Sequence, residues 1–309
     1  MAHVEESTRN EGVGSARDAA GESETGSHAE RGTKIIALAG KGGVGKTSIA
    51  ATIVRLLVQA YPGKRILAID ADPAVGLSTA LGIEVGTTID DIRKAVVDAA
   101  EGGDANGAIE LLGEARYRIF DALEEGDGFS FIAVGRPEAA GCYCKVNAYL
   151  KEVIAILAEN FDYVVIDGEA GIEQINRRVM ERVTQLLLVT DSSRKGTQVI
   201  QTIREVADEL VMYEQLGAIA NRLPSPDVQR FMDLGGIPLL AAIPSDGSLA
   251  EFDLKGENVF YLPATAPIVT GTADALRAMG ILPAECTAVP APAASKPAVA
   301  VSPEEVAVP

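Results

Sequence analysis

One eight-residue stretch, GKGGVGKT at residues 40–47, constrains the fold of this chain more than any other. It follows a short apolar run at 34–39 and precedes SIAATIVRLLVQ, a run that is compatible with a helix. The stretch matches the pattern G-x-x-x-x-G-K-[ST] in the strand-to-helix context that this pattern requires. The sequence therefore predicts a phosphate-binding loop after the first strand of an α/β fold.

The residue types in this loop suit the binding of a nucleotide's phosphates. Gly42, Gly43 and Gly45 allow backbone amides to curl around phosphate oxygens, and the helix N-terminus adds positive potential. We expect Lys46 to reach the β- and γ-phosphates and the Thr47 hydroxyl to ligate Mg²⁺. The predicted cofactor-binding loop comprises Gly40, Lys41, Gly42, Gly43, Val44, Gly45, Lys46, Thr47 and Ser48.

Short apolar runs alternate with amphipathic stretches of helix length along most of the chain. This alternation is typical of βαβ units and predicts a single α/β domain of the P-loop NTPase type. We expect a mainly parallel, doubly wound sheet of about seven or eight strands flanked by helices. The expected strands are 34–39, 65–69, 129–134, 163–166, 185–189, 216–220 and 239–243, and a helix is expected over 146–161.

The two ends of the chain differ in composition from this domain. Residues 1–31 lack an apolar period and residues 285–309 alternate Ala, Pro and Val, so both are predicted to be disordered and to flank a domain at 32–284. The net charge of −17 argues against a nucleic-acid partner. With no apolar run of membrane-spanning length and no signal-peptide pattern, we expect a cytoplasmic protein without a membrane partner.

Carboxylates follow two of the expected strands. The strand at 65–69 leads into Asp70 and Asp72, and Asp72 is placed to orient or deprotonate an attacking water. The strand at 163–166 leads into Asp167, which we expect to hold Mg²⁺ through water, and Gly171, whose N–H is placed to reach the γ-phosphate. Each stretch alone is also compatible with a simple polar strand end.

Two later strand ends are candidates for recognition of the base. Asn221 and Arg222 follow the expected strand at 216–220, and Pro244 and Asp246 follow the one at 239–243. The Asn/Thr-Lys-x-Asp motif that usually reads guanine is missing from NRLP, so ATP is the expected nucleotide.

A second lysine in the loop, Lys41, carries a resemblance to a known class. The run K-G-G-V-G-K-T resembles the deviant phosphate loop of the MinD/ParA/nitrogenase-iron-protein class of ATPases, and the two acidic strand ends resemble that class's switch regions. The resemblance implies that ATP hydrolysis is coupled to opening and closing of a homodimer, in which Lys41 reaches the partner's nucleotide. The expected catalytic residues are then Lys41, Lys46 and Asp72; a solvated Lys41 is the alternative.

The stretch GCYCKVN at 141–147 holds two of the three cysteines, Cys142 and Cys144. In extended chain, residues i and i+2 point to the same side, and a following helix N-terminus and Lys145 both favour thiolate. Cys286 falls near the C-terminal segment and both histidines lie in residues 1–31, so a second chain is the simplest source of further ligands. Four thiolates suit Zn²⁺ or Ni²⁺, whereas two small buried apolar residues are the alternative.

A narrower resemblance rests on three stretches together. GKGGVGKT, GRPEAAGCYCKVNAYL and DGEAGIEQINRR resemble the CooC-type ATPases, accessory proteins of carbon monoxide dehydrogenase. The resemblance implies an ATP-dependent metallochaperone with Ni²⁺ or Zn²⁺ at Cys142 and Cys144 and a client metalloenzyme, carbon monoxide dehydrogenase or a relative. Two alternatives stay open: an ATP-gated electron donor resembling nitrogenase iron protein, and a MinD/ParA-like positioning ATPase.

Overall fold

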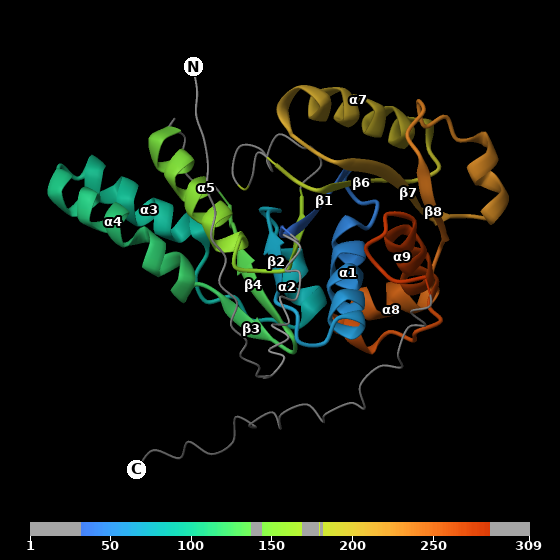
Figure 1. Cartoon of the computed structure of the whole chain (residues 1–309), viewed down its shortest axis with the longest axis horizontal. Helices are drawn as coiled ribbons and strands as arrows, with labels where there is room; N and C mark the ends of the chain where they lie inside the picture. Colours follow the sequence, from blue (N-terminus) through green and yellow to red (C-terminus); the bar gives the residue numbers. More distant parts are fainter. Residues whose placement is uncertain (1–31, 137–143, 169–178, 180–181, 285–309) are drawn as a thin grey trace, which may run out of the picture. The chain divides into compact units, whose positions relative to one another are not determined.

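A single eight-stranded sheet forms the centre of the computed structural model (Figure 1), which describes residues 32–136, 144–168, 179 and 182–284. The strand order is β3-β4-β2-β5-β1-β6-β7-β8, and every neighbouring pair is parallel except β3 with β4. The strands are β1 (Lys34–Gly40), β2 (Ile66–Asp70), β3 (Glu124–Gly126), β4 (Phe129–Ala133), β5 (Tyr163–Asp167), β6 (Gln185–Thr190), β7 (Gln215–Leu223) and β8 (Leu239–Pro244). The predicted mainly parallel α/β sheet is confirmed.

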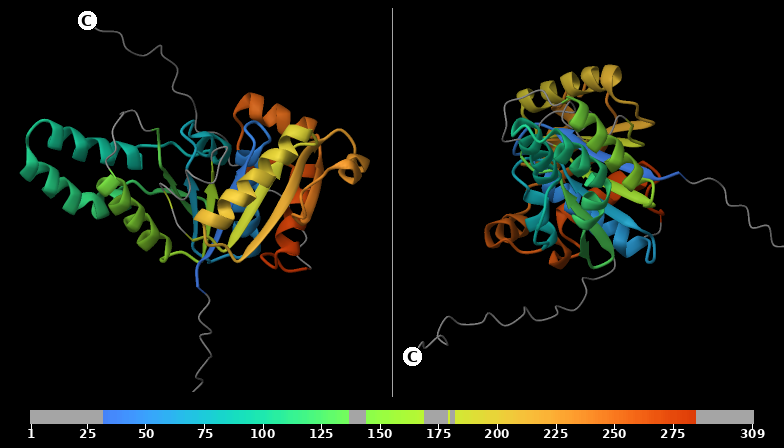
Figure 2. Two further views of the ribbon diagram at one scale, coloured as in Figure 1. Left: turned by 90° about the horizontal axis from the view of Figure 1, so that it is seen from above. Right: turned by 90° about the vertical axis from the view of Figure 1, so that its left-hand side faces the viewer.

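Helices cover both faces of this sheet, as Figures 1 and 2 show. One face carries α1 (Lys46–Ala60), α2 (Gly76–Leu81), α8 (Gly247–Lys255), α9 (Pro267–Ala278) and the 3₁₀ helix η2 (Val259–Tyr261). The other carries α3 (Ile89–Glu101), α4 (Ala105–Asp121), α5 (Cys144–Ala158) and α7 (Arg194–Leu210), while the 3₁₀ helix η1 (Pro226–Phe231) lies between β7 and β8. The sheet is therefore doubly wound, as the alternating pattern predicted.

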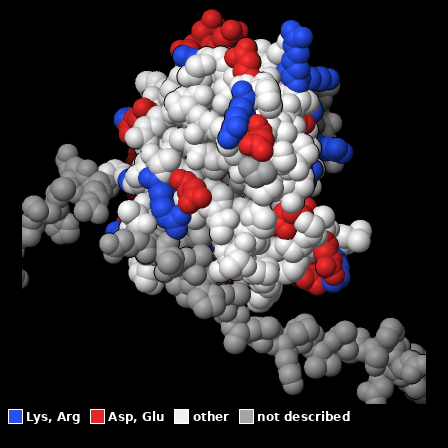
Figure 3. Space-filling view, turned by 90° about the vertical axis from the view of Figure 1, so that its right-hand side faces the viewer, with Lys and Arg blue, Asp and Glu red and all other residues white. Residues whose placement is uncertain are grey.

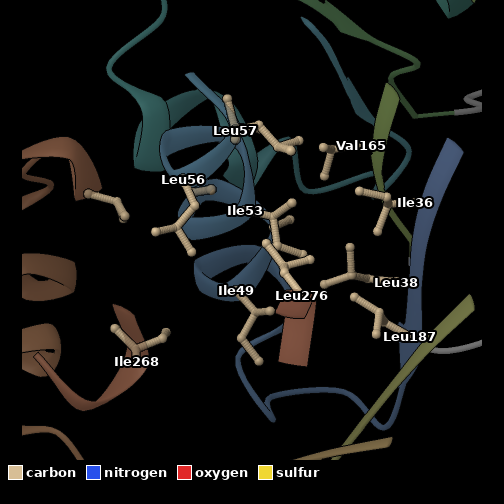
Figure 4. Close-up of a cluster of buried hydrophobic side chains, with 14 of the residues drawn as sticks. Ile36, Leu38, Ile49, Ile53, Leu56, Leu57, Val165, Leu187, Ile268 and Leu276 are labelled. Carbon is tan, nitrogen blue, oxygen red and sulfur yellow. The ribbon is translucent and has the colours of Figure 1, made fainter. Parts of the chain in front are cut away.

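The two faces of the sheet divide the hydrophobic core into two layers. Along β1, Ile36 and Leu38 join the layer under α1 and α9, whereas Ala37 and Ala39 join the opposite layer. Figure 4 shows the first layer, where the apolar face of α1 meets side chains of the sheet and of α9. Each fully buried Ile or Leu side chain stabilises the fold by about 1.5–3 kcal/mol relative to an exposed one. This packing fixes α1, and with it the loop that precedes α1.

Apart from shifts of one to three residues at the strand ends, the structure differs from the sequence predictions at three places. It adds the edge strand β3, whose sequence EEG has no apolar alternation and which pairs with β4 across a tight turn. The helix expected over 146–161 runs from Cys144 to Ala158. Asn221 and Arg222 lie within β7 rather than after it. The two terminal segments predicted to be disordered lie outside the described residues.

The described surface mixes charged and uncharged side chains. On the face in Figure 3, most of the area comes from uncharged residues, and acidic and basic side chains are scattered over it. Within the described ranges, none of the helices has both the length and the apolar composition needed to cross a bilayer.

Candidate nucleotide site

The phosphate loop lies between the end of β1 and the start of α1, where two close approaches require glycine. A Cβ on Gly40 would collide with the carbonyl oxygen of Val189 in the neighbouring strand β6. Gly45 has φ +92°, and a Cβ there would lie 2.6 Å from Nδ2 of Asn221. The two glycines therefore let the loop pack tightly against β6 and β7.

A pocket of about 440 Å³ opens over this loop. Its lining residues are Gly42, Gly43, Gly45, Lys46, Thr47, Ser48, Asp72 and Arg222. Lys46 is only 7% exposed, and its Nζ donates to the carbonyl oxygens of Gly40 at 3.2 Å and Lys41 at 3.3 Å. This ammonium group is held within the curve of the loop, as a phosphate-binding lysine must be. Val44 instead buries its side chain in the core, so it supports the loop.

Two side chains of β7 hold the loop from the opposite side. Nδ2 of Asn221, which is 2% exposed, donates to the carbonyl oxygen of Val44 at 2.8 Å. Nη1 of Arg222 donates to the carbonyl oxygen of Gly43 at 2.7 Å, and Arg222 has φ +56°. A left-handed backbone is costly for arginine, so the sheet must fix this residue against its local preference. Contact of either residue with adenine remains a prediction.

The other two predicted base-binding residues lie at the end of the adjacent strand. Pro244 ends β8 and is in register with Leu223 of β7, so the β7–β8 pairing brings both predicted pairs to one edge of the sheet. Asp246 caps α8, and its Oδ1 accepts hydrogen bonds from the backbone N–H groups of Ser248 at 2.9 Å and Leu249 at 3.3 Å. These contacts order the start of α8 beside the loop after β8.

A pair of buried carboxylates lies at the ends of β2 and β5. Asp70 and Asp167 are register partners and neither side chain is exposed to solvent. Burial raises the pKa of Asp70 to about 6, against hydrogen bonds from the backbone of Leu77 and Asp72 that lower it. Asp70 was not among the predicted site residues, although its position at a strand end next to Asp72 was visible in the sequence.

The carboxylate of Asp167 fits a divalent cation. Burial raises its pKa to about 7, opposed by Thr47 and Lys46, which lie near it. Among the described residues, neither oxygen of Asp167 accepts a hydrogen bond of normal geometry. A buried carboxylate without donors beside a threonine hydroxyl is a donor set that suits Mg²⁺. When bound there, Mg²⁺ would neutralise phosphate charge, while Thr47 and Asp167 would fix its position.

Asp72 stands on the opposite wall of the pocket in a strained turn. Its Oδ1 accepts from the backbone N–H of Ala74 at 2.9 Å, and its carbonyl oxygen accepts from that of Val75 at 3.0 Å. Val75, just before α2, has φ +50°. A β-branched side chain disfavours that conformation, so this segment stores backbone strain. The half-buried Asp72 faces the pocket, where its predicted role with water requires it to be.

Lys41 is held by the loop that follows β6. Its Nζ forms an ion pair with Oδ2 of Asp191 at 2.7 Å and lies 3.4 Å from Oγ of Ser193. Burial alone would raise the pKa of Asp191, but hydrogen bonds from Lys41 and Ser193 lower it overall. The sequence prediction missed Asp191, because only tertiary packing brings it next to a residue 150 positions earlier.

The predicted metal residues are only partly within the described chain. Cys144 is the first residue of α5, whereas Cys142 and Gly171 lie outside the described residues. No group of three or more His, Cys, Asp or Glu with metal-binding geometry occurs in the part of the chain that the structure describes.

The fold and this site together define the class of protein. A phosphate loop at the end of a central parallel strand, with carboxylates on the neighbouring strand ends, is the arrangement of a P-loop ATPase. The particular family follows from comparison: residues 35–259 match the CbiA family, the CobQ/CobB/MinD/ParA nucleotide binding domain, and this chain belongs to that family.

Individual relatives agree with this assignment. The chain is 36% identical over 234 residues to an uncharacterized ATP-binding protein of Methanocaldococcus jannaschii, covering 74% of this chain and 91% of the relative. It is 32% identical to the carbon monoxide dehydrogenase accessory protein CooC of Rhodospirillum rubrum, covering 79% and 94%. A septum site-determining protein MinD from Pyrococcus horikoshii, solved with Mg-ADP, shares the fold with a TM-score of 0.57, 23% identity and coverage of 80% and 96%.

Proposed function

We propose that this ATPase is a homodimeric metallochaperone or maturation factor that supports nickel insertion into carbon monoxide dehydrogenase or a related metalloenzyme. The observation that carries the proposal is the similarity to CooC, which extends over 79% of this chain and includes the region of the C-x-C motif. In this proposal residues 32–284 form the ATPase domain, and residues 1–31 and 285–309 are segments appended to it.

The position of α5 supports a metal role for the cysteine pair. The segment that carries Cys142 leaves the carboxyl end of β4 and enters α5 at Cys144. The carboxyl ends of β1, β2 and β5, which bear the nucleotide site, lie along the same edge of the sheet. The helix N-terminus favours thiolate, the form that binds metal. Cys142 and Cys144 from two chains would then hold Ni²⁺ or Zn²⁺ as cargo.

The contacts of Lys41 describe the state of this residue before the proposed nucleotide cycle begins. Within one chain this lysine is paired with Asp191, so it must leave that ion pair before it can reach a partner's nucleotide. In the proposed cycle, ATP and Mg²⁺ bring two chains together, Lys41 contacts the partner's phosphates, and Asp72 positions the attacking water. Hydrolysis then reopens the dimer and allows the metal to be transferred.

Anaerobic native mass spectrometry tests the proposal with Ni²⁺ or Zn²⁺ and a non-hydrolysable ATP analogue. The wild type should bind one metal per dimer, and the double variant Cys142→Ser/Cys144→Ser should form the dimer without metal. Cys286→Ser is the matched control and should bind metal like the wild type. Nucleotide-bound dimers that lack metal in every variant would reject the metallochaperone while leaving the ATPase intact.

The same preparation separates the two alternative functions. An electron donor resembling nitrogenase iron protein would carry an iron–sulfur cluster and absorb visible light after anaerobic purification. A positioning ATPase would co-sediment with liposomes or DNA when ATP is added. Lys41→Ala should abolish hydrolysis and ATP-dependent dimerisation in the proposed cycle; full retention of both would rule out its action across the dimer.

A further inference from the structure

An aromatic groove lies at the amino edge of the sheet, opposite to the nucleotide site. It has a volume of about 730 Å³ and is bordered by the segments that precede β2, β4 and β5. Aromatic rings line much of it, from Tyr61, Phe120, Phe129 and Phe161. The volume falls within the range of pockets that bind ligands, and none of the residues assigned to the nucleotide or metal sites borders it.

Some aromatic rings of this groove are held by stacking on other rings, and one is exposed to solvent. Tyr61 at the end of α1 stacks on Tyr163 with ring centroids 5.1 Å apart, and Phe129 stacks on Phe260 at 5.8 Å. Phe120, at the end of α4, is 38% exposed and borders the groove. Packed aromatic rings of this kind form the grooves that bind proline-rich chains.

The described chain ends close to this groove. The hydroxyl of Tyr61 donates to the carbonyl oxygen of Ile281, and the last described residue, Ala284, follows three positions later. Residues 285–309 then contain five prolines and five valines. Lys296 lies only twelve positions after Ala284, a span of about 37 Å if fully extended as polyproline II. The groove is therefore within reach of the chain's own C-terminal segment.

Three charged residues line the groove: Lys64 and Arg65 are basic and Glu125 is acidic. Lys64 is already paired with Asp162 at 2.8 Å, so Glu125 is the residue of the groove that suits a basic group of this segment. Lys296 is the only basic residue in 285–309 and stands directly before Pro297. The groove contains Glu125 on the edge strand β3, whose Oε1 accepts from Ser130 at 3.1 Å. Within the described chain, no basic side chain lies within ion-pair distance of Glu125.

We propose that the segment 285–309 docks in this groove of its own chain, with its Pro and Val residues against the aromatic rings and Lys296 beside Glu125. The docked segment would cover Phe120 and the edge of β3. It would also give the chain a contact surface that is separate from the nucleotide and cysteine regions, and it depends on neither the metal nor the client of the proposed function.

Hydrogen exchange on the full chain tests this docking. Peptides that cover residues 61–66 and 120–130 are compared between the wild type, Lys296→Glu and a variant in which residues 285–309 are replaced by a Gly/Ser sequence of equal length. A segment docked four fifths of the time would slow exchange of the amides it covers about fivefold. Both variants should lose this protection, whereas Glu304→Lys should retain it and peptides from α7 should not change.

Carbodiimide cross-linking tests whether the segment 285–309 of the same chain occupies the groove. The wild type should yield a Lys296–Glu125 cross-link within one chain, and Glu125→Lys should restore protection to the Lys296→Glu variant. A mixture of ¹⁵N-labelled and unlabelled chains distinguishes the source of the segment. Cross-links that join labelled to unlabelled chains would overturn docking within one chain. Equal exchange in the wild type and the Gly/Ser variant would overturn docking altogether.

Discussion

The two walls of the nucleotide pocket differ in whether their polar groups have partners within the chain. On the wall formed with β6 and β7, three polar groups of the loop have partners: Asn221 and Arg222 donate to two of its carbonyl oxygens and Lys41 is paired with Asp191. On the wall formed by β2 and β5, Asp70 and Asp167 are buried with raised pKa values. The groups named on the first wall have their partners within the chain. On the second wall, the buried carboxylates cost free energy when they are ionised, and a bound cation would offset that cost.

This difference indicates which wall provides preformed phosphate contacts and which wall changes when nucleotide and Mg²⁺ bind. Lys41 must leave Asp191 to act across a dimer, but the rest of the loop is held by hydrogen bonds and can offer its phosphate contacts with little rearrangement, which favours binding. A wall with the unsatisfied carboxylate of Asp167 and a strained turn at Val75 gains more from the ligand and is the part that can respond to it. Nucleotide with Mg²⁺ should therefore change the second wall more than the first.

Removal of Lys46 should have the largest effect, because it takes the buried cation out of the phosphate loop. We expect Lys46→Ala to weaken ATP binding by at least about 30-fold, since loss of one partner of a buried charge contact costs about 2–5 kcal/mol. Isothermal titration calorimetry measures the affinity. The exposed Lys195→Ala on α7 is the control and should bind as the wild type does. An affinity within threefold of the wild type would contradict the assignment of Lys46.

Asp167→Asn tests the unsatisfied wall through pH. The pKa of Asp167 is raised in the folded chain, so its stabilising contribution is complete below the unfolded value near 4 and is lost as pH rises through about 7. Without nucleotide and Mg²⁺, the wild type's free energy of unfolding should thus fall between pH 4 and 8. Asp167→Asn should remove much of this fall and be more stable at pH 8, by on the order of 2–4 kcal/mol.

Denaturant unfolding at pH 5 and pH 8 measures both quantities. Asp162→Asn provides a control of opposite sign, because hydrogen bonding from Lys64 lowers the pKa of Asp162, against a smaller effect of burial. Its stabilising contribution is present above the unfolded pKa, so the Asn variant should lose stability at neutral pH. A steep fall that persists in Asp167→Asn would show that this carboxylate is not the strained group.

Asn221→Ala should break the satisfied wall by leaving the buried carbonyl oxygen of Val44 without its donor. An unsatisfied buried group costs about 1–3 kcal/mol, so the free energy of unfolding should fall by that amount. Chemical denaturation of the nucleotide-free chain measures it. The matched variant Asn160→Ala removes an exposed side chain that bonds the last turn of α5 and should cost less. Equal losses for the two variants would mean that Asn221 does not hold the loop.

The smallest expected effect comes from relief of strain on the second wall. Val75→Gly should raise the free energy of unfolding by about 1 kcal/mol, because glycine adopts φ +50° without a Cβ clash. Thermal unfolding measures the change. Its exposed neighbour Ala74 has no positive φ, so Ala74→Gly should instead destabilise slightly. Destabilisation by Val75→Gly would show that the strain is smaller than the packing of the Val75 side chain against the core.

Much of the fold was predictable because the signals are local. The seven expected strands all appear, since each is a short apolar run bounded by turn residues. The strand β3 was missed because its pairing with β4, and not its own composition, makes EEG a strand. The phosphate loop was predictable for the same local reason: the sequence of one loop and its flanking elements determines its shape.

Contacts between distant segments account for what the sequence did not reveal about the site. Asn221 and Arg222 were expected at the base, and the structure places both against the loop backbone. Asp191 was not expected at all, yet it holds Lys41. Asp70 was visible at a strand end, but its coupling to Asp167 depends on the register between β2 and β5.

Hydrophobic periodicity and glycine spacing act over a few residues, so the amino-acid sequence was enough to predict seven of the strands and the phosphate loop. Which side chains support that loop, and which carboxylates are buried beside it, follows from tertiary contacts. At the nucleotide site, hydrogen bonds join groups from positions up to 179 residues apart, and burial and the resulting pKa values depend on the same tertiary contacts. No local pattern records these contacts, since they depend on which strands pair and on how the loops at the strand ends pack together.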